Sequence, residues 1–140
     1  MIPAMQVLLE QQEGFCAKPY RDSRGFLTIG FGTNLDAGIT RDQAGAIMQI
    51  AVNANAQALS ELPWFAGLNP VRQGVIENMA YNMGIDGVLG FRNMIAAIKA
   101  EDWPEAARQM RASDWGVQVG DRAKALAQIM ETGVMPDAAV

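Results

Sequence analysis

The segment 14–38, which is rich in turn-forming residues and lies between stretches of helical pattern, constrains the fold more than any other part of the chain. Within it, the sequence DSRG at 22–25 has Asp first and Gly fourth, as a type I turn favours. The flanking residues 17–21 and 26–31 include the aromatic and β-branched residues typical of strands. This pattern predicts a β-hairpin, extended to a third short strand near Leu35.

Apolar residues at helical spacing fill most of the remaining sequence. A first helix is predicted over 3–13, because Pro3 suits the first turn of a helix. Thr40 and Gln43 form a capping-box pattern, which predicts the start of a second helix that runs to about Leu59. Further helices are predicted over four ranges: 70–84, 91–100, 104–110 and 121–131.

These elements predict an α+β chain with a small β-lobe and a mostly helical lobe. The β-lobe covers about 14–38 and the helical lobe about 40–133, with the helix 3–13 packed into the helical lobe. Asp121 is predicted to be the N-cap of the last helix. A length of 140 residues, half of them apolar, suits a single domain, 1–140, with a core of ordinary size.

The chain has no histidine. This absence excludes a His-based serine triad, a Cys–His pair and a His-ligated zinc site. Acid–base chemistry near neutral pH would therefore fall to carboxylates, or less often to lysine or tyrosine. The single cysteine, Cys16, precludes an intramolecular disulfide.

The net charge of −4 argues against nucleic acid as the main partner, because neutralising phosphates needs clustered Lys and Arg. The N-terminal sequence 1–14 lacks the basic region and the long apolar run of a signal peptide or a membrane span. We therefore expect no signal peptide and no stable membrane insertion. The chain should fold in the cytoplasm of the cell that makes it, and something else must release it if it acts outside the membrane.

Glu13, Asp22 and Thr28 form a compact acid, carboxylate and hydroxyl arrangement around the predicted hairpin. Taken alone, they can be a solvated helix residue, a turn former and an ordinary strand residue. Together they supply what glycosidases need, an acid for the leaving oxygen and a second group that handles water or the developing positive charge. Glu13 also lies in the last turn of its helix, where the dipole disfavours another negative charge, as suits a proton donor.

The order of residues around this trio resembles the active-site segment of the phage lysozyme family, glycoside hydrolases of the T-even phage type. The similarity rests on three short sequences: EG at 13–14, PYRD at 19–22 and GFLTIGFG at 25–32. With this spacing the trio falls on the family's catalytic Glu, Asp and Thr without a gap. Looser matches follow in the same order in the later part of the chain, so the similarity spans from about residue 5 to 133. One departure is Thr33, because relatives of this type commonly carry a His at that position.

The resemblance implies a lysozyme-like fold with a cleft between the two lobes, and cleavage of the β-1,4 bond between N-acetylmuramic acid and N-acetylglucosamine in peptidoglycan. Glu13 would protonate the glycosidic oxygen. Asp22 would stabilise the oxocarbenium-like state or help direct water, and Thr28 would hold the attacking water. The family implies inversion, which requires the two carboxyl groups to be roughly 6.5–9.5 Å apart.

Four further positions carry over from the family as substrate-binding residues: Asn78, Asn82, Gln118 and Arg122. Amide side chains suit the N-acetyl and hydroxyl groups of sugars. Arg122 matches a basic residue that faces the catalytic Glu across the cleft. Taken alone, all four can be ordinary polar residues of helix surfaces.

The family further implies a bacteriophage or prophage endolysin that lyses its host from inside and depends on a holin to reach the cell wall. No metal or cofactor is implied, and we expect a monomer. Two alternatives stay open: a lytic transglycosylase, which makes an anhydro sugar without water, and a non-catalytic peptidoglycan-binding or virion protein with a lysozyme fold. A plain helical interaction domain is a third, more remote alternative. Asp22 and Thr28 favour hydrolysis, and the intact trio argues against a protein without activity.

Overall fold

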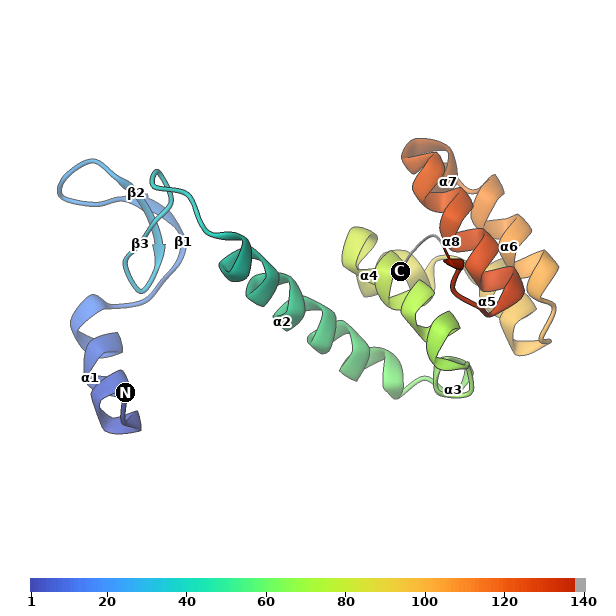
Figure 1. Ribbon diagram of the computed structural model, residues 1–140, viewed down its shortest axis with the longest axis horizontal. Helices are drawn as coiled ribbons and strands as arrows, with labels where there is room; N and C mark the ends of the chain where they lie inside the picture. Colours follow the sequence, from blue (N-terminus) through green and yellow to red (C-terminus); the bar gives the residue numbers. More distant parts are fainter. Residues whose placement is uncertain (138–140) are drawn as a thin grey trace. The chain divides into compact units, whose positions relative to one another are not determined.

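The computed structural model describes residues 1–137, so residues 138–140 of the predicted domain lie outside the described part. The chain divides into two compact units, Met1–Ile47 and Met48–Val140 (Figure 1). A three-stranded antiparallel sheet near the N-terminus precedes a mostly helical region, which confirms the predicted α+β class. The packing of the helix 3–13 into the helical lobe stays a prediction.

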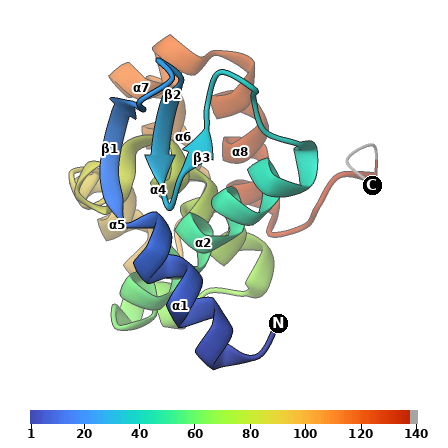
Figure 2. The ribbon, with the colours of Figure 1, turned by 90° about the vertical axis from the view of Figure 1, so that its left-hand side faces the viewer.

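The N-terminal unit begins with helix α1 (Pro3–Glu13), which has the predicted bounds. Gly14 ends this helix with a φ of 74°, a conformation that glycine adopts at little cost. Strand β1 (Cys16–Arg21) pairs with β2 (Leu27–Gly30), and β2 pairs with β3 (Thr33–Asn34), all antiparallel. The order β1-β2-β3 makes β2 the central strand (Figure 2).

The turn between β1 and β2 has the predicted form. The N–H of Gly25 donates to the carbonyl of Asp22 at 3.0 Å, which closes the turn, and Gly25 has a φ of 83°. In the sheet, Thr28 lies opposite Tyr20 on one side and opposite Asn34 on the other. The register therefore places Thr28 on the central strand, close to the turn that carries Asp22.

Helix α2 (Arg41–Ser60) starts at the predicted capping box. The hydroxyl of Thr40 accepts the N–H of Gln43 at 3.1 Å, and the Gln43 side-chain oxygen accepts the N–H of Thr40 at 2.8 Å. This reciprocal pair satisfies two backbone donors that a helix start leaves free. The boundary between the two units falls within α2.

The C-terminal unit is helical. After α2, its helices are α3 (Pro63–Ala66), α4 (Pro70–Leu89), α5 (Arg92–Lys99), α6 (Trp103–Ala112), α7 (Asp114–Val119) and α8 (Asp121–Thr132). Helix α6 packs against α5 and α8, and α8 also contacts α4 and α7 (Figure 1). Apolar side chains from most of these elements form the core, and the largest fully buried ones are Leu59, Ile76, Met79, Val88, Met94, Met110 and Met130. Within residues 1–137, no helix has both the length and the apolar character needed to cross a membrane.

Some details of the helical region differ from the sequence prediction. Helices α3 and α7 were not predicted, because elements this short show too little apolar periodicity to be recognised. Asp121 does not cap α8: Gly120 is at the N-cap, and Asp121 is the first helical residue. The helix that starts at Pro70 is interrupted at Gly84 (φ 81°, ψ 165°), as the sequence suggests, but helical structure then resumes and runs to Leu89.

Arg72 of α4 ties that helix to the end of α8. Its Nε donates to the carbonyl of Met130 at 2.7 Å, and its Nη2 donates to that of Glu131 at 3.0 Å. The guanidinium carbon also lies 3.8 Å from the centroid of the Trp103 ring. The last carbonyls of a helix have no intrahelical partner, so Arg72 supplies the donors that the end of α8 lacks.

We predict that Arg72→Ala lowers the free energy of unfolding by about 2–3 kcal/mol, because two carbonyls lose a charged donor and Trp103 loses its stacked cation. Arg72→Lys should restore only part of this loss, since an ammonium group lacks the planar fork. Arg108→Ala is the matched control, because in the part of the chain that the structure describes Arg108 forms only an exposed pair with Glu105, at 2.7 Å. Denaturant unfolding measures the change, and equal losses in the two alanine variants would contradict the role of Arg72.

Candidate active site

Glu13 is the last residue of α1, and its carboxylate lies over the turn between β2 and β3. A methyl group at Gly32 would sit 2.8 Å from Oε2 of Glu13, so the missing side chain of this glycine leaves room for the carboxylate. The rings of Phe15 and Phe31 pack against each other with centroids 5.4 Å apart. This contact holds the segment just after α1 against the same turn.

Asp22 is fixed by the turn that it starts. One carboxylate oxygen, Oδ1, accepts the backbone N–H groups of Arg24 and Phe26, both at 2.9 Å. Aspartate commonly stabilises a turn in this way. Among residues 1–137 the other oxygen, Oδ2, has no hydrogen-bond partner, so Oδ2 is the atom that Asp22 can offer to a ligand or a water molecule.

Thr28 is only 3% exposed, and its hydroxyl donates to the carbonyl of Phe26 at 2.9 Å. The same carbonyl accepts the backbone N–H of Asp22, also at 2.9 Å. Phe26 therefore contacts both predicted catalytic residues of the hairpin, Asp22 through both backbone groups and Thr28 through the carbonyl. A hydroxyl that donates to the backbone keeps its lone pairs for accepting, so Thr28 can accept a hydrogen bond from water.

The N-terminal unit brings the whole predicted trio around one short strand. Glu13 lies at the turn that follows β2, Asp22 lies in the turn that precedes β2, and Thr28 is on β2 itself. These are two carboxyl groups near opposite ends of a four-residue strand, with a hydroxyl between them. Such a set can donate a proton, stabilise a positive charge and hold a water molecule.

The predicted substrate-binding residues lie in the C-terminal unit, and the structure joins only some of them. Oδ1 of Asn78 accepts from Nε and Nη2 of Arg122, at 3.2 and 2.7 Å. Oδ1 of Asn82 accepts instead from the indole N–H of Trp115 at 2.7 Å. Gln118 is exposed on α7. Trp115 therefore binds one of the four predicted substrate-binding residues, although it was not among the four itself.

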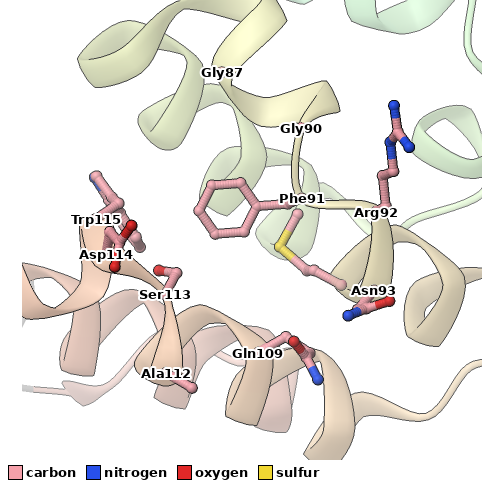
Figure 3. A pocket seen from close by; sticks show the side chains of 11 residues that line it. Gly87, Gly90, Phe91, Arg92, Asn93, Gln109, Ala112, Ser113, Asp114 and Trp115 are labelled. Atoms are coloured by element: carbon pink, nitrogen blue, oxygen red, sulfur yellow. The ribbon is translucent and has the colours of Figure 1, made fainter.

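Of the cavities in the C-terminal unit that border these residues, two have several polar side chains in their walls. One, of about 350 Å³, is lined by Asn78 and Arg122 together with Tyr81 and Glu77. The other, of about 400 Å³, has Trp115 in its wall and lies between the end of α4, the start of α5 and the α6–α7 junction (Figure 3). Its lining combines aromatic rings with amide, hydroxyl and carboxyl groups: Phe91, Trp115, Asn93, Gln109, Ser113 and Asp114. Polar groups set into an apolar wall are typical of ligand pockets. These polar residues were not found from the sequence, because they are spread over three helices.

Comparison with known proteins shows which family the chain belongs to. The sequence model of the family described as "Phage lysozyme" matches residues 10–129. The chain belongs to the phage lysozyme family. This result confirms the resemblance found from the sequence, and the α+β architecture agrees with a lysozyme-like fold. Membership of the phage lysozyme family implies a peptidoglycan hydrolase of the glycoside hydrolase type.

Individual relatives of this chain are distant. "Probable T4-type lysozyme 1" of Dictyostelium discoideum is 24% identical over 96% of this chain and 98% of its own length. "Probable T4-type lysozyme 2" of the same organism is 22% identical over 98% of this chain and 99% of its own. The "Pre-baseplate central spike protein Gp5" of Enterobacteria phage T4 is 30% identical over 93% of this chain, which covers only 28% of that protein.

We predict that Gly32→Ala leaves the protein folded but lowers its rate of peptidoglycan cleavage roughly 10- to 100-fold, because the new methyl group displaces the Glu13 carboxylate. Gly38→Ala is the matched control: its φ of 74° is close to the 80° of Gly32, but its methyl group would meet no described atom within 4 Å. Both variants should lose about 1–2 kcal/mol in the free energy of unfolding, since both strain the backbone. Equal cleavage rates in the two variants would contradict the position assigned to Glu13.

Proposed function

We propose that this member of the phage lysozyme family is a muramidase, which hydrolyses the β-1,4 bond between N-acetylmuramic acid and N-acetylglucosamine in bacterial peptidoglycan. The observation that carries the proposal is the arrangement around β2, with Glu13 near one end, Asp22 near the other and the Thr28 hydroxyl between them. Glycosidases cleave their substrates with a pair of carboxyl groups that flank the scissile bond.

In the proposed reaction Glu13 is the general acid. Its proton passes to the glycosidic oxygen as the bond from that oxygen to the anomeric carbon breaks, and positive charge develops on the sugar ring. Asp22 faces this charge with Oδ2, the oxygen that the turn leaves free, while Oδ1 stays fixed by two N–H groups. Asp22 thereby stabilises the oxocarbenium-like state or helps to direct the water.

The attacking water is held by Thr28, whose hydroxyl donates to Phe26 and so offers its lone pairs to the hydrogens of water. Attack from the face opposite the leaving group inverts the anomeric centre. Inversion requires the carboxyl groups of Glu13 and Asp22 to be far enough apart to admit this water, roughly 6.5–9.5 Å. As water adds to the anomeric carbon, its proton passes to the Asp22 carboxylate, and exchange with solvent then returns a proton to Glu13. The products are two glycan fragments with one new reducing end.

Substrate binding is proposed for Asn78, Asn82, Gln118 and Arg122. The bond from Arg122 to Asn78 fixes the guanidinium group, which can then donate to sugar hydroxyl or carbonyl oxygens at a defined position. Asn82 keeps its amide N–H groups for a ligand, because its oxygen is taken by Trp115.

The biological setting that we propose is an endolysin of a bacteriophage or prophage. It acts as a monomer, stays in the host cytoplasm until a holin releases it, and then lyses the cell wall. The match to a virion spike protein of which this chain covers 28% supports a second candidate, in which the same muramidase domain is borne by a virion.

Mass spectrometry of digested peptidoglycan tests the proposal. The wild type should release muropeptides with N-acetylmuramic acid at the reducing end. Glu13→Gln should release them at least about 100-fold more slowly, because general acid catalysis typically contributes at least this factor to the rate. Asp22→Ala should be severely impaired and Thr28→Ala impaired to a lesser degree. Glu10→Gln is the matched control on α1, because within residues 1–137 the Glu10 side chain bonds only to Gln6, at 3.0 Å.

Each outcome of this experiment has a distinct meaning. Full activity in Glu13→Gln would show that another group is the acid. Anhydro products from the wild type would identify a lytic transglycosylase, since hydrolysis adds water and transglycosylation does not. A folded wild type that binds the polymer but cleaves nothing would identify a non-catalytic protein.

A further inference from the structure

Asp36, which lies in the loop after β3, contacts the same peptide group that orients Thr28. Its Oδ2 accepts the backbone N–H of Leu27 at 2.8 Å. This N–H and the carbonyl of Phe26 belong to one planar peptide group, so they point in opposite directions and move together. At the carbonyl end, the group accepts the Thr28 hydroxyl and the Asp22 N–H, both at 2.9 Å. One peptide group therefore links Asp36 to two residues of the proposed site.

Neighbouring groups hold Asp36 in this position. The N–H of Leu35 donates to the carbonyl of Leu27 at 2.7 Å, so the loop is bound to both backbone groups of Leu27. Nη1 of Arg21 donates to the carbonyl of Gly25 at 3.0 Å and lies 3.7 Å from Oδ2 of Asp36. The side chains of Arg21 and Asp36 are 67% and 45% exposed, so their ion pair contributes little to stability. The contact that matters is the hydrogen bond from Leu27.

We propose that Asp36 is a positioning residue of the muramidase site, which acts through the Phe26–Leu27 peptide group on Thr28 and Asp22. A charged acceptor on the N–H polarises the peptide group and makes its carbonyl a stronger acceptor. The Thr28 hydroxyl is then held in the orientation that donates to Phe26 and leaves its lone pairs for the attacking water. Without Asp36 the peptide group can tilt, and the hydroxyl and the start of the turn lose their fixed positions.

This inference rests on the proposed function, and steady-state kinetics on a soluble peptidoglycan fragment tests it. Asp36→Ala should lower kcat roughly 10- to 100-fold, the effect of a small misplacement in a catalytic site. KM should change less than about twofold, because Asp36 acts on the chemical step rather than on binding. Asp36→Asn keeps an oxygen for Leu27 without the charge, so its kcat should be only about 2- to 5-fold below wild type. Asp86→Ala, which removes an exposed carboxylate elsewhere, controls for the change in net charge and should retain wild-type kcat.

A double-variant comparison separates positioning from a general loss of structure. If Asp36 acts through Thr28, adding Asp36→Ala to Thr28→Ala should lower kcat much less than Asp36→Ala lowers it in the wild type. Losses that multiply fully would overturn the proposal, and so would an Asp36→Ala variant with wild-type kcat. If Asp36→Ala does not fold, Asp36→Asn takes its place in this comparison, and wild-type kcat in Asp36→Asn would then overturn the proposal.

The amide resonance of Leu27 provides a readout that does not depend on activity. In Asp36→Ala the Leu27 amide proton should move upfield, because it loses a short bond to a carboxylate, and in Asp86→Ala it should stay in place. An unchanged Leu27 resonance in Asp36→Ala would overturn the proposal even if activity fell. A wild type that cleaves nothing would instead refute the muramidase assignment, so the two failures are distinguishable.

Discussion

The hydrogen bonds of Phe26 form the hairpin turn and the proposed site at the same time. Its N–H is bound to the carboxylate of Asp22, and its carbonyl is bound to the Asp22 N–H and the Thr28 hydroxyl. Thr28 is almost fully buried, and a buried hydroxyl without a partner costs about 1–3 kcal/mol. The residues proposed for chemistry are therefore also those that close the turn, so the hairpin cannot form in this register without bringing Asp22 and Thr28 together.

Glu13 reaches this arrangement by a different physical route. Its position depends on a helix that ends at a glycine, on the contact between Phe15 and Phe31, and on the space left by Gly32. Local sequence specifies the helix end. The place of the Glu13 carboxylate at Gly32 depends instead on the contact between the end of α1 and the turn that joins β2 to β3. The family match accounts for the kind of reaction. These contacts account for how the chain can hold the proposed acid beside β2, which carries Thr28, and near the turn that carries Asp22.

The sequence allowed the local features to be predicted and left out those that depend on tertiary contact. Helix α1, the hairpin turn and the capping box of α2 follow from residues a few positions apart, and the structure confirms them. Asp121 was wrongly predicted as a cap because Gly120 takes that position. The bonds of Asn78 to Arg122 and Asn82 to Trp115 join residues 44 and 33 positions apart, which no periodicity reveals. Asp36 was missed because an aspartate in a loop resembles an ordinary turn former.

In the proposed reaction, one water molecule, held beside β2, attacks the sugar directly. Proton NMR of the reducing end, recorded within the first turnovers before the anomers equilibrate, tests this claim most directly. Direct attack on a β-linked sugar should give the α-anomer first, with the β-anomer appearing later by mutarotation. If the β-anomer appears first, the reaction proceeds through a covalent intermediate or an equivalent second inversion. The role of Thr28 as the holder of the attacking water would then be wrong.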